Sequence, residues 1–167
     1  DKSIEEKRNI DLLTDSYEKS LTIMKESFIT EVLWGALPED KIIDGLESYN
    51  IAINRLSCKN VTVFEADYAS DLVYNITREF IPVSIKKIIE EHFEGRCEYL
   101  VYIGTSLIIA ITSWSHTSPI KEIMSISNEI CSSCKKVIGI ETTAGVGRVY
   151  ESLSDIHKSF KEGRKAL

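Results

Sequence analysis

The chain has 167 residues, of which 43% are hydrophobic and 28% are charged, enough for one globular domain with a core and one extended accessory element. Its 20 basic and 26 acidic residues give a formal net charge of −6, so we do not expect this segment to bind a nucleic-acid backbone on its own. No apolar run approaches the ~20 residues of a membrane-spanning helix, and Asp1 begins the chain with no secretory signal after it. We therefore expect a fragment of a cytoplasmic protein without membrane contact.

A long N-terminal helix is predicted over residues 3–36, where apolar residues recur every three or four positions and no glycine precedes Gly35. At about 1.5 Å per residue it would be roughly 45 Å long, more than a domain of this size can bury. Two interpretations remain, a pair of shorter helices packed on the core or a dimerising coiled-coil arm, and we favour the arm. The candidate dimer interface consists of Ile10, Leu13, Tyr17, Leu21 and Met24. We divide the chain into a linker helix, residues 1–36, and an αβ domain, residues 37–167.

The segment after this helix is predicted to contain a short helix and then a strand. Pro38 suits the first turn of a helix, and apolar spacing continues to about Tyr49. Residues 50–60 form a connection. Residues 61–67 are β-rich and are predicted to be a strand.

Helical spacing returns at Leu72, Val73 and Ile76 and continues beyond Pro82 as far as Gly95. Because proline removes a backbone donor and clashes with the preceding turn, Pro82 must break or kink this helix. Gly95 is expected to end it.

A β-hairpin is predicted where two apolar runs, 99–103 and 107–111, flank Gly104-Thr-Ser. Gly104 is expected at a turn position that needs a positive φ. The second run has no polar face, so it should be a central strand that is covered on both sides.

The rest of the chain is predicted to add a helix, a strand and a final helix. Residues 118–131 combine a Ser-Pro start with an apolar stripe, residues 140–146 are extended, and residues 152–155 resemble a capping box before a helix that runs to Leu167. From residue 61 the order is strand, helix, strand, strand, helix, strand, helix. This order predicts an α+β fold of the ferredoxin-like or nucleotide-cyclase-like kind, with an antiparallel mixed sheet.

The cysteines and tryptophans indicate no cofactor chemistry. Cys131 and Cys134 have the spacing of a redox pair or of half a zinc site, but they lie at the end of a helical pattern without further ligands nearby. We predict inert, reduced thiols and expect neither a metal nor a cofactor. Trp34 and Trp114 are expected to be core anchors.

The stretch from Thr143 to Glu162 carries a group of residues that matches a known signature. It resembles the end of the degenerate GGDEF-like domain of YesN-type response regulators, which are AraC-family transcription regulators of two-component systems. A weaker resemblance at residues 25–35 extends the similarity over most of the chain. The matching positions are Gly145, Gly147, Arg148, Tyr150, Leu153, Ser154, His157 and Ser159.

This resemblance implies that the segment is the non-catalytic middle of a longer, homodimeric protein. A receiver domain and a helix-turn-helix domain of the same full-length chain would be its partners, and DNA would be bound only by the helix-turn-helix domain. Its function would be to relay the receiver's state and to support dimerisation. The alternative is a regulatory domain that senses a small molecule or a nucleotide in a remnant of the cyclase cleft.

The residues that an active cyclase would need are mostly replaced. Glu65 and Asp67 match the acidic positions of the first strand, and Gly104 matches a hairpin glycine, but Ser106 and Leu107 stand where the resemblance requires carboxylates. Isolated acids cannot hold two Mg²⁺ ions against a triphosphate, so we expect no enzyme activity. The Gly145-Val-Gly147 motif lacks the remainder of a phosphate-binding loop. We predict that it allows tight packing between the last strand and the last helix.

Overall fold

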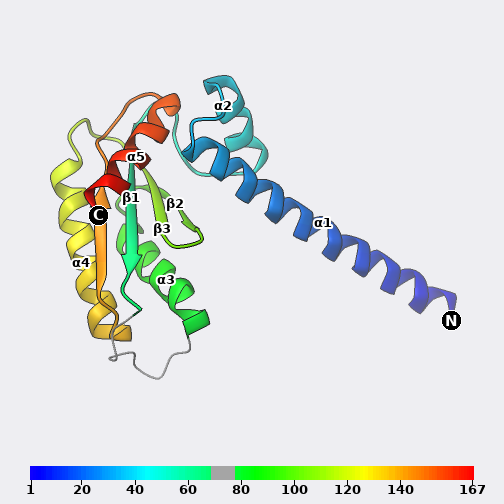
Figure 1. Ribbon diagram of the computed structural model, residues 1–167. Helices are drawn as coiled ribbons and strands as arrows, with labels where there is room; N and C mark the ends of the chain where they lie inside the picture. Colours follow the sequence, from blue (N-terminus) through cyan, green and yellow to red (C-terminus); the bar gives the residue numbers. More distant parts are fainter. Residues whose placement is uncertain (69–77) are drawn as a thin grey trace.

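The computed structural model describes residues 1–68 and 78–167. Figure 1 shows a compact body from which one long helix projects. The elements in chain order are α1 (Lys2–Leu33), α2 (Glu39–Ser48), β1 (Cys58–Ala66), η1 (Arg78–Phe80), α3 (Ile81–Phe93), β2 (Glu98–Ile103), β3 (Ile108–Trp114), α4 (Ile120–Ile138), β4 (Thr142–Val146), η2 (Leu153–Asp155) and α5 (Ile156–Ala166).

The sheet has four strands in the order β2-β3-β1-β4, and every neighbouring pair is antiparallel. The hairpin β2–β3 lies between the two helices α3 and α4 along the chain, so the topology is a split βαβ arrangement. The predicted α+β fold of the ferredoxin-like kind is confirmed. The sheet is antiparallel throughout the described part of the chain.

Each face of the sheet is covered by a separate apolar cluster. Phe64, Ala110 and Trp114 belong to the cluster on the α3 and α4 side, while Val63 and Ile111 belong to the cluster that the end of α1, α2 and α5 complete. All seven residues of β3 are buried, which confirms the prediction of a central strand covered on both sides.

Several element boundaries differ from the predicted ones because strand pairing and packing extend the elements. β1 begins at Cys58, not at residue 61, because Cys58 pairs with Trp114 at the far end of β3. α4 continues seven residues beyond Cys131, to Ile138, and Gly139 ends it with a φ of 71°. Pro82 lies in the first turn of α3, where its ring is tolerated. The helical spacing predicted from Leu72 lies outside the described residues.

The prediction of a positive φ at Gly104 is wrong. The positive-φ glycines among the described residues are Gly35, Gly95 and Gly139. The hairpin closes instead through the N–H of Gly104, which donates to the carbonyl of Leu107 at 2.8 Å. A Cβ at Gly104 would lie 3.0 Å from that same oxygen. Glycine is therefore favoured here by the close approach of the Leu107 carbonyl, and not by a left-handed backbone conformation.

The Gly145-Val-Gly147 motif forms the close contact between β4 and α5, as predicted. A Cβ at Gly145 would lie 2.0 Å from the carbonyl oxygen of Gly163, and a Cβ at Gly147 would lie 2.0 Å from that of Ser159. The fully buried Ser159 hydroxyl accepts a hydrogen bond from the Val61 N–H (2.8 Å) and donates to the Arg148 carbonyl (2.7 Å). Two glycines therefore let α5 sit directly on the sheet.

Candidate functional site

The candidate dimer interface lies on the part of α1 that projects from the body (Figure 1). Burial begins only at Phe28, near the end of the helix. The five candidate side chains are exposed: Ile10 by 62%, Leu13 by 70%, Tyr17 by 64%, Leu21 by 37% and Met24 by 54%. The arm is one continuous helix, so the interpretation as two shorter helices packed on the core is wrong.

The five side chains form one stripe along the arm. At 100° per residue they fall within about 80° of one another around the helix axis. Ile4 and Leu12 are equally exposed but lie about 140° around the helix from Tyr17. The opposite side of the helix carries charge, with an exposed ion pair between Lys19 and Asp15 at 3.3 Å.

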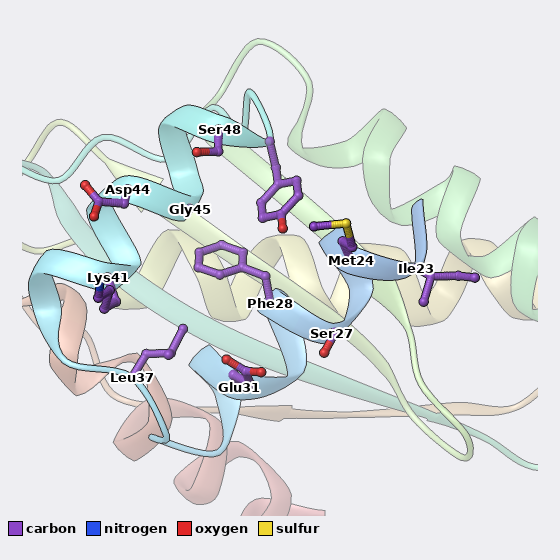
Figure 2. Close-up of a pocket in the computed structure, with 11 residues that line it drawn as sticks. Ile23, Met24, Ser27, Phe28, Glu31, Leu37, Lys41, Asp44, Gly45 and Ser48 are labelled. Atoms are coloured by element: carbon purple, nitrogen blue, oxygen red, sulfur yellow. The ribbon is translucent and has the colours of Figure 1, made fainter. Parts of the chain in front are cut away.

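A groove of about 510 Å³ lies between α1 and α2, where the stripe reaches the body (Figure 2). Met24 and Phe28 line it from α1, and Tyr49, whose ring centroid is 5.4 Å from that of Phe28, lines it after α2. Gly45 lets the two helices approach closely, since a Cβ there would lie 2.0 Å from Phe28 Cε2. The exposed stripe is thus continuous with a groove of mixed polar and apolar character.

The positions that match a cyclase site by resemblance lie at one end of the sheet. Phe64 pairs with Ile108, so the end of β1 that carries Glu65 and Asp67 lies beside the hairpin turn. Glu65 and Asp67 are exposed, and the Asp67 N–H donates to the carbonyl of Glu141 at 2.8 Å.

The turn itself carries no acid. Ser106 is exposed, while Leu107 is half-buried and packs against the apolar cluster that contains Val63 and Ile109. Because the leucine side chain is a hydrocarbon, the Leu107 position offers no side-chain oxygen to a metal ion. Among the residues that the structure describes, no group of three or more His, Cys, Asp or Glu side chains is placed to hold a metal.

The two cysteines of α4 and Cys97, which precedes β2, lie in surroundings that disfavour the thiolate. Burial raises the pKa of Cys131 to about 11 and the pKa of Cys97 to about 12, and it also raises the pKa of the buried Cys134. A thiol activated for redox chemistry shows the opposite shift.

None of the helices in the described part is long and apolar enough to cross a membrane.

The two tryptophans occupy different surroundings. Trp114 is 1% exposed and packs edge-on against Phe93, as expected for a core anchor. The same prediction for Trp34 is wrong, because Trp34 is 60% exposed at the end of α1. The guanidinium of Arg164 lies over its ring, 4.3 Å from the centroid. No sequence pattern indicates this pair, because 130 positions separate its members.

Comparison with known proteins finds a family match for the body of the chain. A family model described as a GGDEF-like domain matches residues 60–167, from β1 to α5. No curated protein matches the chain. Among solved structures, the intact alpha subunit of aIF2 from Pyrococcus abyssi is similar, with 17% identity and a TM-score of 0.39 over 71% of this chain. The chain spans 47% of the length of that protein.

Proposed function

Because the chain belongs to the GGDEF-like domain family, we propose that it is a non-catalytic relay and dimerisation domain of a cytoplasmic AraC-type response regulator. A receiver domain would precede α1, and a helix-turn-helix domain that binds DNA would follow α5. The resemblance between residues 143 and 162 supports the AraC context. The main support for the role in dimerisation is the exposed stripe on α1.

An exposed apolar stripe of this length favours pairing with a second copy. Soluble monomers rarely expose a contiguous apolar face, and two α1 helices side by side would remove Tyr17 and Met24 from water. The heptad seam is imperfect, since Ser20 and Ser27 occupy positions that favour apolar residues. We therefore expect an affinity on the order of micromolar for this segment alone.

The contacts at the end of α1 offer a short path for a relay. Phe28, Ile29, Val32 and Leu33 are buried in the same cluster as Ile156 and Phe160 of α5. Gly35 lies so close to α5 that a Cβ would be 2.8 Å from His157 Cγ. A rotation or register shift of the paired α1 helices would press directly on α5, the element that precedes the DNA-binding domain in the proposed protein.

The composition of the hairpin supports a function without catalysis. Phosphoryl transfer by two metal ions needs several carboxylates around one point, and Ser106 and Leu107 supply none. The alternative function, sensing in the cyclase remnant, would need a polar pocket beside Glu65 and Asp67. A hollow does adjoin the hairpin, but α1 and α5 form its other walls and neither acid lines it.

Light scattering over a concentration series tests the proposal. The parent chain should show the mass of a dimer, and the double variant Tyr17→Lys, Met24→Lys should be a folded monomer. The matched control is Ile4→Lys, Leu12→Lys, which adds the same charge on the opposite side of the helix and should remain dimeric. A parent that is monomeric at every concentration, or a control that dissociates equally, would contradict pairing through the stripe.

A further inference from the structure

A second hollow, of about 270 Å³, lies where the end of α1, the β2–β3 hairpin and α5 meet. Trp34 and Arg164 line it from the two helices, and Tyr102, Thr105 and Ser106 line it from the hairpin. Three segments far apart in the sequence thus form one enclosure at the root of the arm.

Arg164 is the cationic group of this hollow. Its guanidinium carbon lies 4.3 Å from the ring centroid of Trp34 and 4.6 Å from that of Phe160. Its Nε is buried and has no hydrogen-bond partner among the described residues. No carboxylate in the described part of the chain pairs with it, whereas Arg148, sixteen positions earlier, pairs with Glu162 at 3.3 Å.

The hairpin supplies hydroxyl groups to the same hollow. The Tyr102 hydroxyl lies 3.5 Å from Thr30 Oγ1, and Thr105 and Ser106 are exposed at the tip of the turn. Leu33 and Ile109 add apolar surface to the lining. The hollow therefore combines a cation without a carboxylate partner among the described residues, hydroxyl groups, and an aromatic ring that is 60% exposed.

We propose that this hollow binds a small organic anion, a carboxylate attached to a flat apolar body. The planar guanidinium can present its terminal Nη1 and Nη2 groups to a carboxylate, which accepts two parallel hydrogen bonds from them. The apolar body would lie against the Trp34 ring, which is 60% exposed. The volume fits a molecule with one ring, since sites for larger ligands begin at about 300 Å³. This binding is independent of the pairing of α1.

Titration of the chain with benzoate, followed by tryptophan fluorescence, tests the assignment. Trp34 is exposed and Trp114 is 1% exposed, so a saturable change in emission would report on the hollow. Arg164→Gln should weaken binding at least tenfold. Arg164→Lys should do the same, because lysine keeps the charge but not the fork. The matched control Arg148→Gln should bind benzoate within twofold of the parent, and benzylamine should give no saturable change.

A measurement on the unaltered chain covers the case in which the Arg164 variants do not fold. In a ¹⁵N NMR spectrum, benzoate should shift the Arg164 Nε–H signal, which belongs to the same guanidinium, with the same midpoint as the fluorescence change. The proposal is overturned if benzoate produces no saturable effect, or if folded Arg164→Gln binds it equally well. Equal affinity for inorganic phosphate would refute the apolar part of the ligand assignment.

Discussion

Gly147→Ala tests the close contact between β4 and α5 on which the body depends. The new methyl group would lie 2.0 Å from the Ser159 carbonyl oxygen and 2.5 Å from its hydroxyl. Because the first of these atoms is backbone, α5 itself must move away from the sheet. This movement would also break the hydrogen bonds from the Val61 N–H and to the Arg148 carbonyl.

The magnitude follows from these contacts. Overpacking in a well-packed core costs about 1–3 kcal/mol, and each of the two buried hydrogen bonds contributes about 1 kcal/mol. We expect the free energy of unfolding to fall by about 3–5 kcal/mol. For a chain of this size that corresponds to a melting temperature lower by roughly 10 °C or more.

Urea denaturation at a fixed protein concentration measures this change. The control is Gly95→Ala, because Gly95 has a φ of +77° but open space around its Cβ position. It should cost only the left-handed conformation, about 1–2 kcal/mol. Ser159→Ala removes the two hydrogen bonds without overpacking and should lie between the two. If Gly147→Ala costs no more than Gly95→Ala, the motif does not serve the packing of α5.

Three further predictions concern catalysis, DNA and pH. With GTP and Mg²⁺ or Mn²⁺ the chain should form no cyclic dinucleotide and show no GTP-dependent rise in melting temperature. A bound ligand at 100 times its Kd would add about 2.7 kcal/mol to the free energy of unfolding, so binding would be detected. Turnover would contradict the non-catalytic function. In fluorescence anisotropy at near-physiological salt the chain should not bind duplex DNA, because its net charge is −6; a sequence-specific signal would refute this. Above pH 9 the free energy of unfolding should fall. Thiols of the unfolded chain lose their protons around their ordinary pKa of 9.0, whereas burial in the folded chain raises the pKa of Cys97 to about 12 and that of Cys131 to about 11. The pH dependence should be weaker in Cys97→Ala, Cys131→Ala; an unchanged slope would show that these thiols are not shielded.

The sequence by itself determined the order of the elements and, through it, the topology of the sheet. Apolar residues that recur every second position indicate strands, and those that recur every three or four positions indicate helices, so both are local signals. A split βαβ order then leaves few ways to arrange four strands. The exposed stripe of α1 and the loss of acids at Ser106 and Leu107 were also readable, because both depend only on which residue stands at which position.

The tertiary structure alone decided where the side chains of neighbouring elements meet. Lys59 is 1% exposed inside β1, because the carbonyls of Arg55 and Glu151 surround its ammonium group, and this burial lowers its pKa. Trp34 is 60% exposed although tryptophan usually lies inside, and its ring contacts Arg164 and Phe160 of α5. Residue patterns along one element specify which side is apolar but not which distant segment docks on it, so the hollow at the root of the arm appears only once α1, the hairpin and α5 are packed together.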